Sequence, residues 1–299
     1  MTKSIRHRRK RSPGDMGFDI ILTGIMLIII IVCLYPMYYV LCASFSDNTA
    51  LLAKPGIMLY PKGFTLGAYK MALAHPLISS GLKNILIILV FALPLNLFMT
   101  VICGYFMSTK NVLFKKYINF IIIFTMFFGG GLIPTFLNQR SLGLYNNLAA
   151  LIIPGAFSVY NAIICKTAIE AIPDSLVESA YIDGASDIKI LSRIIIPLIR
   201  PTMAVLLLYY GVGHWNSWFN ASIYIQEDKL LPIQNVLRAL LIENSNVLGE
   251  GMGTGDEFNR YAEIIKYATI IITTAPILCI YPFLQKYFVK GVMIGAVKG

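Results

Sequence analysis

The sequence predicts an all-α polytopic membrane protein with six transmembrane helices. Of its 299 residues, 57% are hydrophobic and only 13% are charged. Six stretches contain no Asp, Glu, Lys or Arg: 20–46, 84–109, 117–139, 141–165, 201–226 and 267–285. Each approaches or exceeds the roughly 20 residues that a helix needs to cross a hydrocarbon core of ~30 Å. Because a charge at the membrane centre costs about 2.5–3.5 kcal/mol on insertion scales, these stretches favour six spans over a large soluble all-α core.

The positive charges predict the orientation of the spans. The formal net charge of +10 is by itself also typical of nucleic-acid-binding proteins. Lys and Arg, however, concentrate in the N-terminal stretch "KSIRHRRKR", between spans two and three, between spans four and five, and after span six. The positive-inside rule places these segments and both termini in the cytoplasm. We therefore expect the basic tail to set topology and contact membrane lipids, and we expect no nucleic-acid partner.

Several kinds of chemistry have no support in the sequence. The five Cys residues all fall in predicted spans and form no CxxC pair, so neither a metal site nor a disulfide is expected. The glycine-rich stretch "GEGMGTGDEF" lacks the GK[ST] ending of a P-loop, so the chain is not expected to hydrolyse ATP. The three His residues are scattered (His7, His75 and His214), so no catalytic residue is predicted.

One charged segment, "ESAYIDGASDIKILSRIIIP", interrupts the apolar chain between spans four and five. Ser175 and Glu178 have the spacing of a capping box, which predicts a helix capped by Ser175. Gly184 is expected to end this helix at positive φ, and Ser186 to cap a second helix that Pro197 closes. Two short, exposed amphipathic helices under a membrane domain are typical of an element that docks into a partner's groove.

The same segment carries a family resemblance. Its pattern E-x-A-x3-G-x9-I-x-x-P, formed by Glu178, Ala180, Gly184, Ile194 and Pro197, resembles the EAA loop of binding-protein-dependent ABC importer permeases. Ser179 stands where that family usually has Ala. The stretches "GGGLIP", "LGLYNNLAALIIPGAFSVYNAII" and "GHWNSWFNA" resemble the maltose-type carbohydrate-uptake permeases, especially the Gram-positive oligosaccharide group.

The resemblance implies a transport subunit of a bacterial cell membrane. The subunit would bind no cofactor and be coupled to a separate ABC ATPase dimer, which uses ATP and Mg. The implied ATPase-coupling residues are Glu178, Ser179, Ala180, Asp183, Gly184, Ala185, Ile194 and Pro197. The ending "QKYFVKGVMIGAVKG" is similar to the family's C-terminal tail, which implies contacts of Gly291, Gly295 and Lys298 towards the ATPase dimer interface. Three further partners are implied: a second homologous permease subunit, an extracytoplasmic sugar-binding protein and a carbohydrate substrate.

The expected organisation combines the spans with this resemblance. It comprises a basic cytoplasmic tail (1–17), a first transmembrane helix (18–46), an extracytoplasmic loop (47–83), a permease core (84–285) and a cytoplasmic C-terminal tail (286–299). Within the core, residues 172–200 form the coupling loop and residues 227–266 a second extracytoplasmic loop.

The fifth span carries a cluster of aromatic and amide side chains, "YYGVGHWNSWFNASIY". Aromatic rings can stack on the CH faces of sugars while amides and hydroxyls bond sugar hydroxyls, which suits a saccharide path. Trp and Tyr also gather in membrane-interface belts, and a lone His more often packs between helices, so both interpretations stay open. The candidate path residues are Tyr209, Tyr210, His214, Trp215, Asn216 and Asn220.

Two other function classes compete with an ABC permease. An ion-coupled secondary transporter would need carboxylates within the membrane and internally repeated halves, and the sequence shows neither. A membrane enzyme would need His, Asp, Glu or Cys residues that converge near one interface, which the scattered His residues do not favour.

Overall fold

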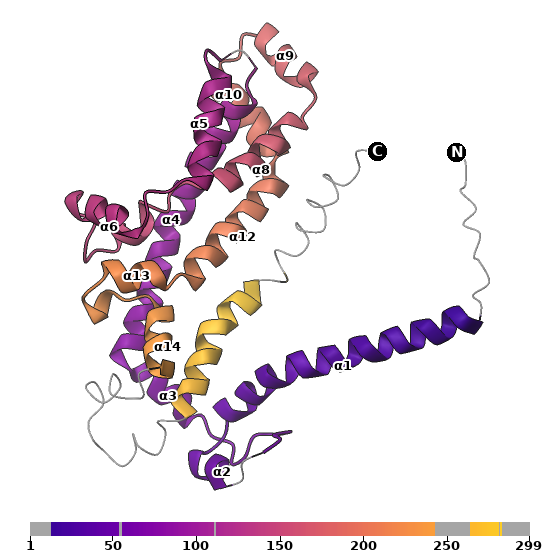
Figure 1. Ribbon diagram of the computed structural model, residues 1–299, viewed down its shortest axis with the longest axis vertical. Helices are drawn as coiled ribbons and strands as arrows, with labels where there is room; N and C mark the ends of the chain where they lie inside the picture. The colour runs from indigo at the N-terminus through magenta and orange to yellow at the C-terminus, as the bar shows by residue number, and fades with distance from the viewer. Residues whose placement is uncertain (1–12, 54–55, 111, 243–263, 281, 283–299) are drawn as a thin grey trace.

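The computed structural model describes residues 13–53, 56–110, 112–242, 264–280 and 282, and every regular element within these residues is helical (Figure 1). The elements in chain order are α1 (Pro13–Ser44), α2 (Asn48–Ala53), α3 (Gly67–Ala74), α4 (Pro76–Ser108), α5 (Lys115–Phe127), α6 (Leu132–Ser141), α7 (Ala149–Ile152), α8 (Val159–Glu170), α9 (Asp174–Ile182), α10 (Asp187–Ile190), the π-helical turn η1 (Leu191–Ile195), α11 (Ile196–Leu198), α12 (Arg200–Asn216), α13 (Phe219–Tyr224), the short 3-10 turn η2 (Asp228–Leu230) and α14 (Ile233–Ile242). A last apolar helix spans Ile264–Ile280.

Several of these helices have the length and composition of membrane spans. Within the described residues, Met16–Ser44 and Pro76–Ser108 are each long and apolar enough to cross a membrane as single helices. Two bent pairs, α5 with α6 and α10–α11 with α12, raise this number to four if each pair counts as one span. The helix Ile264–Ile280 is apolar but shorter. The all-helical membrane class is therefore confirmed, and the count of six spans stays a prediction.

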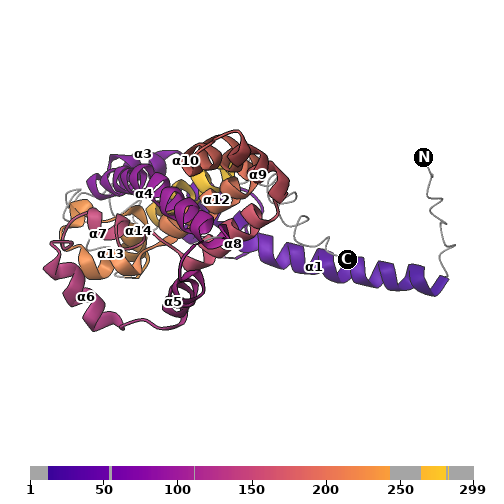
Figure 2. The same cartoon turned by 90° about the horizontal axis from the view of Figure 1, so that it is seen from above.

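The predicted third span, 117–139, is broken in the middle. Its two halves, α5 and α6, meet at an angle of 111°. The break falls at the glycine cluster, where Gly131 has a φ of +83°. This left-handed conformation, which glycine adopts without a steric penalty, cannot continue a right-handed helix. In Figures 1 and 2, α6 accordingly turns away from the direction of α5.

The predicted fourth span, 141–165, is not one helix. The charge-free run contains the four-residue α7, a turn through Pro154 and Gly155, and then α8, which starts at Val159 and continues to Glu170. Proline lacks the N–H that would continue a helix, so the α7 turn cannot propagate through residue 154. The charge-free run was correctly identified as apolar, but its bounds do not match those of the helices that it contains.

Prolines also shape the entry into α12. Pro197 and Pro201 each remove a helical N–H donor, so the carbonyls of Arg193 and Pro197 lose their i+4 partners. The chain forms the π-helical turn η1 just before this point and bends by 81° between α11 and α12, at Ile199. Pro197 lies one residue before the end of the helical run Asp187–Leu198, close to the helix end that its position in the sequence predicted.

Helix α4 is the centre of the packed body. It contacts α3, α7, α8, α12 and α14, and it contributes to both clusters of buried apolar residues. Two glycines allow the closest approaches: a Cβ added at Gly104 would lie 2.8 Å from Cys165 Sγ, and one at Gly81 would lie 3.0 Å from Ile233 Cα. Small residues at helix–helix contacts are typical of membrane proteins, where close backbone packing replaces the hydrophobic drive to associate.

Helix α1 has a different environment. It leaves the helical body and projects to one side in both views (Figures 1 and 2). Its apolar window is not covered by the rest of the described chain. The last turns of α1 anchor it to the described body: Cys42 and Ala43 are buried, and Tyr39 packs edge-on against Tyr267.

Candidate functional site

A cavity of about 730 Å³ lies beside α12 and is lined by segments from distant parts of the sequence. Its walls come from the Gly129–Gly131 hinge and α6, the α7–α8 turn, α12 and α13. Its polar and aromatic lining residues are Thr135, Gln139, Ser158, Asn161, Tyr209, Tyr210, His214, Ser217, Asn220 and Tyr224. None of the described lining residues is an Asp, Glu, Lys or Arg, so this cavity presents amides, hydroxyls and rings to a ligand.

The structure separates the six predicted path residues into two groups. Tyr209, Tyr210, His214 and Asn220 line the cavity. Trp215 does not: it is buried, and its Nε1 donates to the Thr273 carbonyl at 3.1 Å, which holds α12 against the last helix. Asn216 is exposed and is not among the lining residues.

Two of the cavity residues are fixed from outside by α4. The Tyr210 hydroxyl lies 2.7 Å from Thr100 Oγ1 and also accepts from the Ser158 backbone N–H at 3.1 Å. His214 Nε2 lies 2.9 Å from Asn96 Oδ1, and Asn96 Nδ2 donates to the Gly155 carbonyl at 2.7 Å. Because Asn96 Oδ1 can only accept, Nε2 of His214 carries the proton.

This network gives His214 a packing role. It joins α12 to α4 and, through Asn96, to the α7–α8 turn. Buried polar groups are costly without a partner, and here each is paired. The Tyr210 hydroxyl and His214 Nε2 therefore line the cavity while bonded to α4, and Tyr209 and Asn220 line the same cavity.

Two buried amides in the cavity wall are missing from the sequence-based prediction of the site. Gln139 is 7% exposed, and its Oε1 has no hydrogen-bond partner within the described residues. Asn161 is 5% exposed and lines the same cavity from α8. Amides inside otherwise apolar, charge-free runs were the available signal, because intramembrane polar residues usually face a cavity or another helix.

The coupling segment, defined here as residues 172–200, forms a projecting knob at one end of the molecule (Figure 1). Gly184 has a φ of +76° with open space around it, which confirms its predicted left-handed conformation at the end of α9. Glu178 and Asp183 are exposed, and Ala180 is buried against the body. Ile182, the last residue of α9, is 87% exposed, so the knob presents apolar as well as charged surface.

The remaining predicted coupling residues also divide into exposed and partly buried ones. Ser179 is exposed, whereas Ala185, Ile194 and Pro197 are half-buried. Ala185 donates from its backbone N–H to the Ala180 carbonyl at 2.9 Å, which closes the turn around Gly184. The three residues of the predicted tail contact, Gly291, Gly295 and Lys298, lie outside the described residues.

The predicted capping box is wrong. Helix α9 begins at Asp174, and its N-cap position is Pro173, which makes no side-chain cap bond. Ser175 lies inside the helix, where its carbonyl accepts from the Ser179 hydroxyl. Pro173 is pre-set near a helix-compatible φ, so the helix starts one residue before the serine that would have capped it. Glu178 is therefore free of the capping role that the sequence spacing suggested.

Polar contacts tie the coupling segment to the end of α4. Asp187 accepts from the Tyr181 hydroxyl and, at 3.0 Å, from the Tyr105 hydroxyl of α4. These bonds, first that from Tyr181 and then that from Tyr105, lower the pKa of Asp187. Lys110, just beyond α4, pairs with Asp174 at 2.6 Å, and this hydrogen bond raises the pKa of Lys110.

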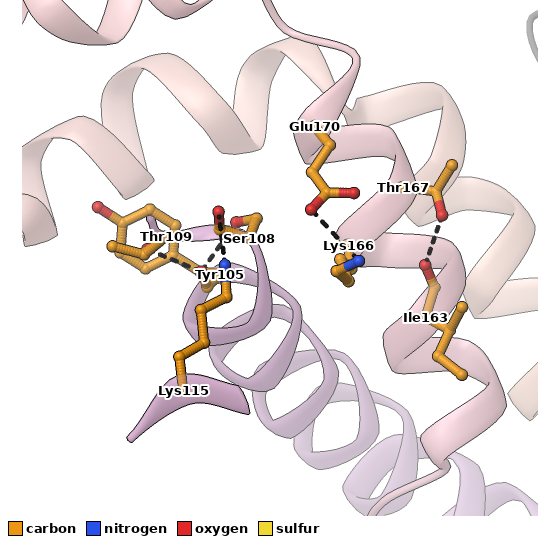
Figure 3. Close-up of polar contacts among 8 residues, drawn as sticks. All are labelled: Tyr105, Ser108, Thr109, Lys115, Ile163, Lys166, Thr167 and Glu170. Atoms are coloured by element: carbon orange, nitrogen blue, oxygen red, sulfur yellow. Dashed lines mark hydrogen bonds and ion pairs between the residues drawn. The ribbon is translucent and has the colours of Figure 1, made fainter. Parts of the chain in front are cut away.

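Neighbouring side chains complete this end of the body. Figure 3 shows Lys115 Nζ donating to the Ser108 carbonyl at 3.4 Å and the Lys166–Glu170 ion pair on α8 at 3.3 Å.

A second cavity, of about 570 Å³, lies between the end of α4 and α9. Within the described part of the chain, no cluster of His, Cys, Asp and Glu side chains could hold a metal ion.

Fold and site together define a class. An all-helical chain with several apolar spans, a polar cavity beside α12 and an exposed charged knob at one end is a multi-pass membrane protein with the features of a permease. Residues 63–294 match the family described as "Binding-protein-dependent transport system inner membrane component", and the chain belongs to this family. It is thus a transport subunit of an ABC importer located in the cell membrane.

Individual relatives are similar in sequence over nearly the whole chain. It is 36% identical over 282 residues to the "Polygalacturonan/rhamnogalacturonan transport system permease protein YtcP" of Bacillus subtilis, covering 94% of this chain and 98% of the relative. It is 38% identical over 268 residues to "Protein LplC" of the same organism, covering 90% of each. A bacterial ABC transporter "involved in the import of the acidic polysaccharide alginate" superposes with a TM-score of 0.85 at 29% identity, covering 93% of this chain and 99% of that one.

Proposed function

We propose that this subunit forms one half of the pore of an oligosaccharide importer and is driven by an ATPase that docks on the coupling segment. The observation that carries the proposal is the exposed knob of α9 and α10, bent at Gly184, on a chain of the binding-protein-dependent family. Docking into a groove needs exposed apolar anchors, and Ile182 and Ile188 are 87% and 80% exposed. Glu178 and Asp183 add charge beside them.

The cavity beside α12 is our candidate for the saccharide path. Tyr209 and Asn220 have the ring and amide chemistry that suits sugar faces and hydroxyls, and Gln139 and Asn161 add two buried amides. Relatives named for polygalacturonan, rhamnogalacturonan and alginate make uronic-acid oligosaccharides the first cargo to test. An extracytoplasmic binding protein would deliver the cargo.

The assembly follows from the same proposal. Six spans with both termini in the cytoplasm place the coupling segment on the ATPase side, as the distribution of Lys and Arg favours. Two-fold ATPase dimers need two docking sites, so a second homologous permease supplies the other half of the pore. Gly291, Gly295 and Lys298 of the tail reach the ATPase interface, and ATP with Mg is used only by the ATPase.

The deciding experiment compares two glycines that have nearly the same positive φ. Gly184 and Gly143 have φ values of +76° and +74°, and a Cβ added at either residue would have no other atom within 4 Å. A valine at either site therefore costs about 1 kcal/mol or more from left-handed strain. We expect Gly184→Val to lose the ATPase during co-purification and to lose transport, and Gly143→Val to retain both.

Two outcomes would contradict the docking proposal. One is wild-type ATPase binding and uptake by Gly184→Val; the other is equal loss in both variants. Glu178→Gln provides an independent check, because Glu178 has no capping role here. If its carboxylate contacts a basic residue of the ATPase, loss of the charge-assisted bond weakens ATPase binding by roughly tenfold.

A further inference from the structure

We propose that Tyr105 is a positioning residue for transport: through α4 it links the coupling segment to the residues that shape the cavity. The inference rests on the proposed function, since it assumes that the ATPase moves the coupling segment. It adds a role for Tyr105, Asn96 and Thr100, none of which belongs to the docking knob or to the predicted saccharide path.

The first step is the contact at the coupling end. The Asp187 carboxylate joins Tyr181 of α9 to Tyr105 of α4, with the Tyr105 hydroxyl 3.0 Å from Asp187 Oδ1. Asp187 opens α10, just after the bend at Gly184. One carboxylate therefore connects the two parts that coupling must join, the docking knob and the central helix.

The second step is the contact at the cavity end of the same helix. Asn96 and Thr100 hold His214 and Tyr210, respectively, at 2.9 and 2.7 Å. Asn96, Thr100 and Gly104 are spaced four residues apart, so they share one face of α4, and Tyr105 follows directly. Nine residues at 1.5 Å each separate Asn96 from Tyr105, a distance of about 14 Å along the helix axis.

The third step is the close packing of the part of α4 between Asn96 and Tyr105. Gly104 brings α4 so close to α8 that a Cβ would lie 2.9 Å from Cys165 Cβ, and Val101 packs in the same buried cluster as Ala180 of the coupling segment. A close-packed segment transmits displacement because it has few alternative arrangements. The two bends of the coupling segment lie outside this close-packed region, at Gly184 and before α12, where the helices turn by 81°.

The test uses the complex of this chain with its companion permease and the ATPase in proteoliposomes, and it needs no sugar. A cysteine at Ser217, in the cavity wall, reports accessibility to a charged, membrane-impermeant methanethiosulfonate. Labelling of the same complex without Ser217→Cys is subtracted, because the chain has five native cysteines. The quantity measured is the change in labelling rate on adding ATP with vanadate.

We expect Tyr105→Phe to retain as much co-purified ATPase as the wild type and to reduce the ATP-dependent change in labelling about threefold to tenfold. The variant removes only one hydroxyl, whose bond to a carboxylate is partly screened by solvent. Tyr117→Phe is the matched control, since Tyr117 of α5 is 69% exposed. It should respond as the wild type does.

A double-mutant cycle tests whether the contact itself matters. Asp187→Asn weakens the Tyr105–Asp187 hydrogen bond by changing its acceptor. The double variant should therefore show the same ATP-dependent change in labelling as Asp187→Asn alone. The inference would be contradicted if the two substitutions together reduced the labelling change by the sum of their separate effects, or if Tyr105→Phe kept the full labelling change. It would also be contradicted if Tyr105→Phe lost the co-purified ATPase, or if ATP did not change the labelling rate in the wild-type complex. A wild-type chain that fails to retain the ATPase would instead overturn the proposed function.

Discussion

The most apolar windows of helices α1 and α4 have the same mean hydropathy but differ in burial. Met16–Ser44 and Pro76–Ser108 contain 29 and 33 residues, and their most apolar windows both average 2.7. Yet none of that window is buried in α1, and 33% of it is buried in α4. The buried residues of α4 include Gly81, Asn84, Asn96, Thr100 and Gly104, whereas the middle of α1 is a run of exposed Ile, Leu and Val side chains.

The difference shows what hydropathy does and does not encode. An apolar helix is stable in lipid on every face, so hydropathy alone does not select a protein-facing side. In α4 that side is selected by glycines, which allow close approach, and by Asn and Thr side chains, which bond other helices. Asn84, for example, donates to the carbonyls of Lys229 and Leu231 at 2.7 and 3.1 Å and holds the segment before α14.

The largest effect on stability is expected from a glycine substitution in α4, compared with a control substitution in α1. Gly104→Leu places a side chain where even a Cβ would lie 2.8 Å from Cys165 Sγ, so α4 and α8 must separate. We expect a loss of about 3 kcal/mol in the free energy of unfolding, or failure to accumulate folded protein. Gly24→Leu, in α1, meets no atom within 4 Å and should be neutral. Thermal unfolding of the purified chain in detergent measures both, and equal stability of the two variants would contradict the packing at Gly104.

The next largest effect is expected at Asn96. Asn96→Leu removes the donor to the carbonyl of the exposed Gly155 and the acceptor for the half-buried His214. A fully buried polar group left unpaired costs about 1–3 kcal/mol, and the partial exposure of these two residues places the expected loss at about 1 kcal/mol. Asn138→Leu is the control, because Asn138 of α6 is exposed. The same unfolding measurement should show destabilisation in the first variant only, and a neutral Asn96→Leu would mean that the network does not hold α12.

The smallest effect is expected from single hydroxyls. Thr100→Val removes the bond to Tyr210, and hydrogen bonds between membrane helices average about 0.6 kcal/mol. The control in α1 is Thr23→Val, because the Thr23 hydroxyl bonds the Asp19 carbonyl of its own helix. Tyr210→Phe should cost more than Thr100→Val, since it also removes the acceptor for the Ser158 N–H. The reverse order would contradict this hydrogen-bond assignment.

The candidate site was predictable in part. Gly184 could be placed at a left-handed bend from the sequence, because a glycine that follows an amphipathic stretch is a local signal. Tyr209 and Asn220 were found from composition and do line the cavity, but Trp215 and Asn216 belong to the same sequence cluster and do not. A cluster in sequence contains several helix faces, and only packing decides which of them borders a cavity.

The sequence by itself determined the membrane class, the apolar stretches, the family and the bend at Gly184. These depend on hydropathy, charge and local spacing, each a property of consecutive residues. The tertiary structure alone decided where α5 and α6 diverge by 111°, why the charge-free run 141–165 breaks at Pro154, and which amides face the cavity. It also decided that Tyr105 meets Asp187, residues 82 positions apart. Such contacts depend on helix–helix packing, and in a uniformly apolar chain the pattern of consecutive residues does not specify which helices meet.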